Sequence, residues 1–355
     1  MARTVIVQKT AAFKVHNPSA TKRGVLEPIS HSISIASDSH EGRQVIERLG
    51  AYGLLGIVTL RHQTSGREDV APAATSAVIA EDTLGNRLCL KFYADSVAGR
   101  DDLRSQAELL QHLQVRIGVP RVVGVEQDPA VFGLPVLITT FIGEPLDHTI
   151  RDITGMERAR LAKEIADCIS ALAKLEPVDL GLQDMSADDI AHTVSAGLAE
   201  DAAWYNNHAP SDDPEVHTLV TRGADMLAAY QVSPHPACLA HHDLTGGNIM
   251  VRERRLAGFV DWDYAGLDLP ERDVGSCISG FLATLPIPLS ERAEMMTLFL
   301  ACRYSGRDQE AETASFIFAL DSILDWLIGG KNAPRHELIW AASVVLERLS
   351  AHRRR

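Results

Sequence analysis

The chain has 355 residues, of which 46% are hydrophobic and 23% charged, so its composition is that of a globular protein and excludes disordered, collagen-like and coiled-coil classes. The formal net charge of -13 argues against a nucleic-acid partner. The sequence contains no run of about 18 apolar residues, so we expect no membrane-spanning helix. The five cysteines are dispersed and form no CxxC pair, so we expect reduced thiols. The first residues contain no apolar segment of the secretory type, and we therefore expect a cytoplasmic protein.

The first 140 residues predict a small lobe built around an antiparallel sheet. Residues 1–55 form a leading segment that ends in an amphipathic helix, EGRQVIERLGAYGL, with Asp38 and Ser39 as N-cap candidates. Short β-rich runs then favour an antiparallel meander, followed by one more helix and two apolar strands. The expected strands are 56–62, 75–82, 86–93, 121–127 and 134–142, and the expected helix is 101–114.

Residues 141–355 predict a larger lobe that is mostly helical. One interruption, 238–263, contains short strand-like runs joined by tight loops, the kind of segment that commonly carries catalytic residues. Residues 101–300 hold 31 Asp and Glu against 14 Lys and Arg, so most of the acidic charge falls in this lobe. The expected helices are 156–175, 187–206, 213–230, 290–304, 309–328 and 335–352.

The interruption contains the most informative motif of the chain, HHDLTGGN followed by VDWD. Asp243 precedes Asn248 by five residues and Asp261 by eighteen, and each lies beside a predicted strand end, so a loop and a returning hairpin could bring all three together. A carboxylate and an amide oxygen are hard ligands suited to Mg²⁺, which keeps part of its shell for water and substrate phosphates. The second carboxylate is then left to accept a proton.

These motifs resemble the aminoglycoside phosphotransferase and choline kinase-like branch of the protein-kinase-like superfamily, in which an H-x-D-x-x-x-x-N loop precedes an I/V-D-[WF]-[ED] element. The resemblance implies an α+β, bilobal protein-kinase-like fold with a small antiparallel-sheet N-lobe and a larger helical C-lobe. It also implies that Asp243 is the catalytic aspartate and that Asn248 and Asp261 are the Mg²⁺ ligands. His241 and Asp273 then have structural roles, with Asp273 tying down the backbone of the catalytic loop.

The resemblance extends to the N-terminal lobe, although no G-x-G-x-x-G joins its first strands. Lys91 interrupts an apolar strand, which is costly unless its ammonium meets a partner, and in the family that partner is the phosphates of the nucleotide. Glu108 falls where the family has the glutamate that pairs with this lysine. The segment LITTFIGEPL resembles the hinge, in which Thr140, Phe141 and Ile142 would bind the adenine edge. ATP or GTP is therefore the expected phosphoryl donor.

The acceptor is expected to be a small molecule. Asp273 follows Asp261 by only twelve positions, too few for the long activation segment with which protein kinases bind a polypeptide, and no Walker A sequence is present. Acidic side chains that pair with ammonium groups are the candidates for acceptor binding, although the same acids could form a solvated face. These candidates are Asp263, Asp268, Glu271, Asp321 and Asp325.

The sequence thus predicts a nucleotide-dependent O-phosphotransferase whose first-ranked acceptor is an aminoglycoside-like antibiotic. One alternative is a kinase for choline, homoserine or a sugar. Another is a nucleotide-binding pseudokinase module, which the joint presence of Lys91, Asp243, Asn248 and Asp261 disfavours, since a protein without turnover could lose any of them cheaply. A zinc site at His241-His242 is disfavoured because no third ligand has suitable spacing.

Overall fold

The computed structural model describes residues 32–35, 40–54, 58–63, 76–175, 186–304, 308–329 and 333–352. The chain divides into two compact units, each described below by itself. The first unit consists of Met1–Gln111 and Pro120–Phe141, and the second of His112–Val119 and Ile142–Arg355. The N-cap candidates Asp38 and Ser39 lie outside the described residues.

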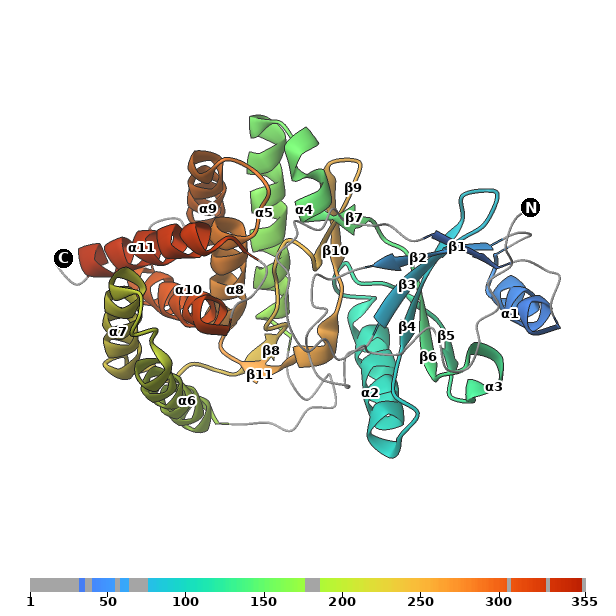
Figure 1. The fold of residues 1–355 in the computed structure, drawn as a ribbon, viewed down its shortest axis with the longest axis horizontal. Helices are drawn as coiled ribbons and strands as arrows, with labels where there is room; N and C mark the ends of the chain where they lie inside the picture. Colours follow the sequence, from blue (N-terminus) through green and yellow to red (C-terminus); the bar gives the residue numbers. More distant parts are fainter. Residues whose placement is uncertain are drawn as a thin grey trace. The chain divides into compact units, whose positions relative to one another are not determined.

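The first unit contains a six-stranded antiparallel sheet with the order β1-β2-β3-β4-β6-β5 (Figure 1). The predicted meander is confirmed by β2, β3 and β4, which pair in sequence, whereas β1 was not predicted in the Ser- and Thr-rich leading segment. Its strands are β1 (Ser32–Ile35), β2 (Val58–Gln63), β3 (Ser76–Glu81), β4 (Arg87–Phe92), β5 (Val122–Glu126) and β6 (Val136–Thr140).

Alternation along the strands builds the core of this unit. Leu88 and Leu90 on β4 are buried, and they belong to one cluster with Leu49 of helix α1 (His40–Ala51). Helix α2 (Val97–Leu113) begins four residues earlier than predicted, because the hydroxyl of Ser96 accepts the Gly99 N–H at 3.1 Å and caps the helix. The short helix α3 (Pro129–Phe132) completes the unit.

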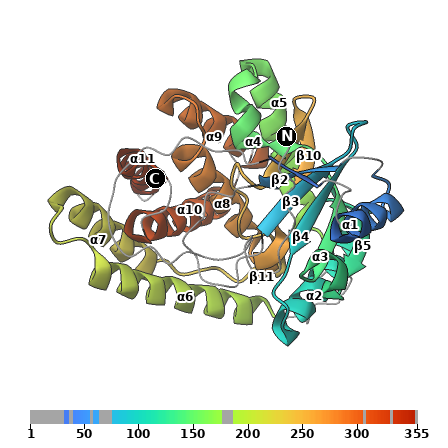
Figure 2. The ribbon, with the colours of Figure 1, turned by 45° about the vertical axis from the view of Figure 1, so that its right-hand side comes forward.

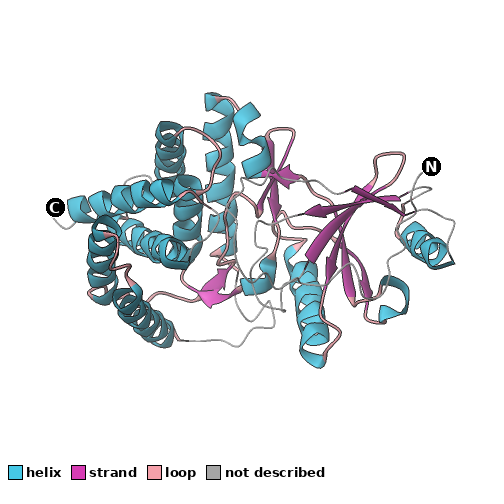
Figure 3. Ribbon diagram, in the orientation of Figure 1, coloured by secondary structure: helices cyan, strands magenta, loops and turns pink. Residues whose placement is uncertain are grey.

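The second unit is mostly helical, as Figure 3 shows, and each of its six predicted helices is present. No helix among the described residues has both the length and the apolar character that crossing a membrane requires. The helices are α4 (Leu146–Thr149), α5 (Gly155–Leu172), α6 (Ala187–His208), α7 (Pro214–Ala228), α8 (Pro270–Ala283), α9 (Leu289–Tyr304), α10 (Gln309–Gly329) and α11 (Arg335–His352), with 3-10 turns at Ile150–Asp152 and Trp262–Tyr264.

Helix α8 is the main difference between expectation and structure in this unit. It packs against α10 (Figure 2), and every residue from Val274 to Ala283 is buried. The charged residues of this helix, Glu271, Arg272 and Asp273, all lie in its first turn, and the stretch from Val274 to Ala283 has no charged residue that would mark a solvent-facing side.

Two small sheets interrupt the helices and frame the loop 241–248. Strand β8 (Cys238–Ala240) precedes this loop and pairs with β11 (Gly266–Asp268), while β9 (Ile249–Arg252) follows it and pairs with β10 (Arg255–Phe259). The strand-like runs predicted in 238–263 are thus confirmed, whereas β7 (Glu144–Pro145) and β11 were not predicted. Both ends of the loop are fixed by strand pairing.

Candidate active site

The backbone of the loop is held by a carboxylate from the first turn of α8. Both oxygens of Asp273 accept the His241 N–H at 2.9 Å, and Oδ1 also accepts the His242 N–H at 2.8 Å. The side chain is fully enclosed, and burial raises the pKa of Asp273 to about 6 in spite of these bonds. Asp273 therefore fixes the two residues that precede Asp243.

His241 links this loop to the end of β10. Its Nε2–H donates to the Val260 carbonyl at 2.8 Å, and its Nδ1 accepts the Asp243 N–H at 3.3 Å, so both ring nitrogens are used by a neutral imidazole. Burial lowers the pKa of His241 to about 4, which keeps the ring neutral at physiological pH. The ring also lies 4.5 Å from that of Trp262, centroid to centroid.

The side chains of Asp243 and Asn248 meet across the loop. Asn248 Nδ2 donates to the Asp243 carbonyl at 2.8 Å and to Asp243 Oδ2 at 3.1 Å. Because both bonds use the amide nitrogen, the amide oxygen of Asn248 is the atom left to face a cation. These bonds also orient the Asp243 carboxylate.

Asp261 stands beside Asn248 because of the strand pairing. The β9–β10 register ends at the pair Ile249–Phe259, and the Val260 N–H then donates to the Asn248 carbonyl at 3.0 Å. Asp261 has a left-handed backbone with φ 64° and ψ 62°, which is uncommon for a residue with a side chain and turns the chain sharply into the following 3-10 turn. The turn leaves its side chain half-buried.

This donor set fits a hard divalent cation. The Asn248 amide oxygen and the Asp261 carboxylate are both oxygen donors, and Mg²⁺ needs only one or two protein ligands when substrate phosphates complete its shell. Within the described ranges, no group of three or more His, Cys, Asp or Glu side chains is arranged to hold a metal. The two histidines of the motif do not form a zinc-type pair, because His241 bonds to Val260 and His242 contacts Asp268.

The lysine and glutamate candidates lie in the first unit. Lys91 is half-buried on β4 between the paired residues Ala77 and Leu137, and its Nζ lies 6.0 Å from the centre of the Tyr93 ring. Glu108 is exposed on α2. The Lys91 ammonium thus lies on β4, and the Glu108 carboxylate lies on α2, the element that follows β4 in the chain.

The hinge candidates lie where the two units join in the chain. Thr140 ends β6, and its N–H already donates to the Arg121 carbonyl at 2.9 Å, so this N–H is not available to a base. The guanidinium of Arg87 lies 5.0 Å from the centre of the Phe141 ring. Ile142 is the first residue of this segment that belongs to the second unit. Any adenine contact from the Thr140 backbone must therefore use its carbonyl.

Burial separates the five acidic acceptor candidates. Asp263 is exposed and Asp325 is half-buried, whereas Asp268, Glu271 and Asp321 are buried. Glu271 faces a small pocket that Tyr230 and Glu310 also line, and burial raises its pKa.

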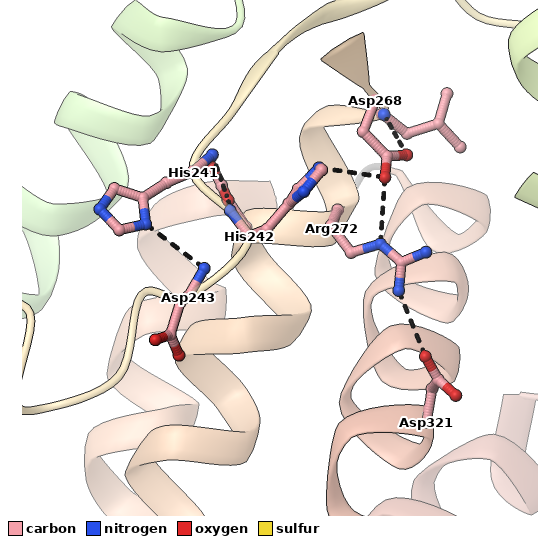
Figure 4. A network of polar contacts seen from close by, with 8 residues as sticks. His241, His242, Asp243, Asp268, Arg272 and Asp321 are labelled. Atoms are coloured by element: carbon pink, nitrogen blue, oxygen red, sulfur yellow. Dashed lines mark hydrogen bonds and ion pairs between the residues drawn. The ribbon is translucent and has the colours of Figure 1, made fainter. Parts of the chain in front are cut away.

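Asp268 and Asp321 differ from expectation because both bind Arg272, at 3.2 and 3.3 Å (Figure 4). A carboxylate neutralised by an internal arginine is not available to a cationic ligand. Sequence reasoning missed Arg272 and also Tyr205, whose hydroxyl donates to Asp321 Oδ1 at 2.8 Å. Arg272 stands between two acidic residues in the sequence, Glu271 and Asp273, and this was the only hint of an ion pair. The pattern shows neither where the Arg272 side chain points nor that its partners are buried.

The phosphotransferase enzyme family matches residues 71–312, which is more than half of the chain. The chain belongs to this family. It is therefore a phosphotransferase of the class that uses a hydroxyl group of a small molecule as acceptor. Among curated proteins, no sequence matches the chain.

Solved structures support the same fold. The chain is 16% identical to the macrolide 2′-phosphotransferase MphH from Brachybacterium faecium, covering 84% of this chain and 97% of that one with a TM-score of 0.53. It is 15% identical to APH(2″)-IIIa in its GDP and kanamycin complex, with coverages of 88% and 98% and a TM-score of 0.57. For ADP-bound APH(2″)-Ib the identity is 17%, the coverages are 87% and 98%, and the TM-score is 0.51. The predicted α+β, kinase-like fold is confirmed.

Proposed function

We propose that this phosphotransferase transfers the γ-phosphoryl group of ATP or GTP to a hydroxyl of an aminated, polyhydroxylated antibiotic of the aminoglycoside type. The observation that carries the proposal is the meeting of Asp243 and Asn248 across the loop, at 3.1 Å, beside the strand end that bears Asp261. One carboxylate can then accept a proton while the other, with the amide oxygen, can hold a cation.

Asp243 is assigned the role of general base. The acceptor oxygen attacks the γ-phosphorus, the bond from that phosphorus to the β–γ bridging oxygen breaks, and the hydroxyl proton passes to the Asp243 carboxylate, leaving a nucleoside diphosphate. The Asn248 amide and the buried His241 hold this carboxylate in place, since Asn248 donates to its oxygen and His241 accepts its backbone N–H. Such positioning suits phosphoryl transfer, which places little covalent demand on the protein.

Asn248 and Asp261 are assigned to Mg²⁺. Bound by their oxygens, the ion would neutralise charge on the transferred phosphate. The backbone hydrogen bond between Asn248 and Val260 keeps these two donors close together without help from a ligand. Lys91 and Glu108, with the hinge residues Phe141 and Ile142, are assigned to the nucleotide on the strength of the sequence motifs.

A cationic acceptor is favoured by the mutual repulsion of acidic side chains in the second unit. Asp325 on α10 interacts electrostatically with Asp201 on α6, and burial together with neighbouring acids raises the pKa of Asp201 to about 6. An ammonium group from a ligand would relieve this repulsion. Asp263, Glu271 and Asp325 stay the candidates for acceptor binding, and Asp268 and Asp321 are left out because both carboxylates bind Arg272.

The test is a panel of acceptors incubated with Mg²⁺ and either ATP or GTP, with mass spectrometry detecting the gain of one phosphate. The panel contains aminoglycosides, a macrolide, choline, homoserine and simple sugars. We expect phosphorylation of an aminoglycoside, with kcat reduced about 10²- to 10⁴-fold in D243N and unchanged nucleotide affinity. D212N is the matched control, because Asp212 is exposed and far along the chain from the loop.

The other outcomes contradict specific parts of the proposal. Transfer to choline, homoserine or a sugar alone would identify a metabolite kinase and reject the antibiotic as acceptor. Nucleotide binding without transfer to any acceptor would identify a binding module. Full activity of D243N would remove Asp243 from its role as general base.

A further inference from the structure

The residue between His241 and Asp243 has an unusual backbone. His242 adopts φ 70°, the left-handed region, where a residue with a β-carbon pays about 1 kcal/mol. This conformation sets the direction in which the chain enters Asp243. A glycine would adopt it without strain, so the presence of a histidine calls for an explanation in its side chain.

The ring of His242 has a buried anchor. Its Nε2 lies 3.2 Å from Asp268 Oδ2, and the Asp268 side chain is only 9% exposed (Figure 4). The same carboxylate accepts the Leu269 N–H at 2.7 Å and the Nε–H of Arg272 at 3.2 Å. Burial alone would raise the pKa of Asp268, but the close approach of the His242 ring and the charge of Arg272 hold it below its usual range. Asp268 is thus an ionised anchor for the ring.

The anchor is itself held from two long helices. Arg272 lies over the Phe318 ring at 4.2 Å and donates to Asp321 Oδ2 at 3.3 Å, so it joins α8 to α10. Asp321 in turn accepts the Tyr205 hydroxyl of α6 at 2.8 Å. A continuous set of polar contacts, centred on the buried Asp268 and Asp321, therefore runs from α6 and α10 to the residue that precedes Asp243.

Resting on the proposed phosphoryl transfer, we infer that His242 is a positioning residue for Asp243, acting through its contact with Asp268. The contact offsets the backbone strain at His242 and holds the turn in one conformation. Arg272, Asp321 and Tyr205 keep the Asp268 carboxylate in place. Without the anchor the turn gains other conformations, and Asp243 leaves its productive position for part of the time. A displacement of about 1 Å at a reacting group can cost about 10²-fold in rate.

The test compares H242G, D268N and the double variant H242G/D268N. Glycine keeps the left-handed backbone without strain but removes the ring, and asparagine keeps the shape of Asp268 without its charge. The matched control is E253G, because Glu253 also has a positive φ, 52°, but is exposed in the β9–β10 turn. If His242 and Asp268 act through one contact, their losses do not add in the double variant.

We expect H242G to lower kcat about 10- to 100-fold, with the KM values for nucleotide and acceptor within about twofold of wild type. The double variant is expected to be no slower than the slower single variant, and E253G to match wild type. A purely structural role would instead lower the melting temperature and the active fraction, so thermal unfolding is measured on each variant. If D268N fails to fold, the split between kcat and KM in H242G decides the question.

An active wild type with an equally active H242G overturns this inference and leaves the proposed function intact. Losses that multiply in the double variant also overturn it, since they show that the two residues act separately. A wild type that phosphorylates no acceptor contradicts the proposed function, and the inference that rests on it fails with it.

Discussion

Both carboxylate oxygens of Asp273 accept the same backbone N–H, that of His241, each at 2.9 Å. The bonds join the buried first turn of α8 to the loop that carries Asp243. Such bonds orient a backbone more firmly than a single contact, because the acceptor cannot rotate without breaking one of them.

The first prediction is that D273N loses both stability and activity. Asparagine keeps the size of the side chain but turns one acceptor oxygen into an N–H₂ donor, which then faces the N–H groups of His241 and His242. An unsatisfied buried donor costs about 1–3 kcal/mol, so we expect the free energy of unfolding to fall by that amount and kcat to fall with it. Denaturant unfolding and steady-state kinetics check this, with D212N as control. Wild-type stability in D273N would show that these bonds contribute nothing.

A second prediction concerns the cation. N248A and D261N each remove one proposed oxygen ligand, and we expect the Mg²⁺ concentration for half-maximal activity to rise about 10- to 100-fold. The measurement is a Mg²⁺ titration at saturating nucleotide, together with calorimetric nucleotide binding in the absence of Mg²⁺, which should not change. An unaltered Mg²⁺ requirement in both variants would place the metal elsewhere.

The third prediction follows from the buried, neutral ring of His241. Its pKa is about 4 in the folded protein and 6.5 when unperturbed, so between these values the unfolded chain binds a proton that the folded protein does not. His241 therefore makes the protein less stable as the pH falls from about 6.5 towards 4, with a limiting slope of about 1.4 kcal/mol per pH unit.

Asp273 has the opposite effect on the pH dependence of stability, over nearly the same pH range. Its pKa is raised to about 6 from 3.8, so the folded protein binds the extra proton and gains stability as the pH falls through 6. Comparison with H241N isolates the histidine: the wild type should lose stability relative to H241N on acidification from pH 6.5 to 4. NMR titration provides the direct measurement, and an imidazole midpoint for His241 at or above 6 would contradict the prediction.

The candidate site was predictable from the sequence to the extent that its geometry is local. Asp243 and Asn248 share one short loop, and Asp261 follows the hairpin that begins there, so spacing and strand periodicity alone bring the three residues together. The roles of Asp268 and Asp321 were not predictable in this way. Their carboxylates meet Arg272 only because α8 packs against α10, and no local pattern reveals such a contact.

The same reasoning explains which elements of the fold were missed. Surface helices such as α6 and α7 show a polar face and N-caps, at Ser186 and Asp213, that mark their first residues. Helix α8 was not among the predicted helices, because its stretch from Val274 to Ala283 has no charged side chain and its N-cap residue Leu269 has no side-chain cap. The two-residue strand β7 and the three-residue strand β11 are too short to show alternation in their sequences. They are strands because they pair with β9 and β8.

The last prediction tests the close packing that hides α8. A β-carbon added at Gly275 would lie 2.6 Å from the Phe318 Cβ and 2.8 Å from the Ser315 carbonyl oxygen, both on α10. G275A should therefore push the two helices apart and lower the free energy of unfolding by about 1–3 kcal/mol. The matched control is G197A in α6, where nothing lies within 4 Å and alanine should stabilise the helix by about 1 kcal/mol. Because Arg272 and Asp321 span the same two helices, G275A should also lower kcat, which G197A should leave unchanged; equal stability of the two variants would show that α8 and α10 are not in close contact at Gly275.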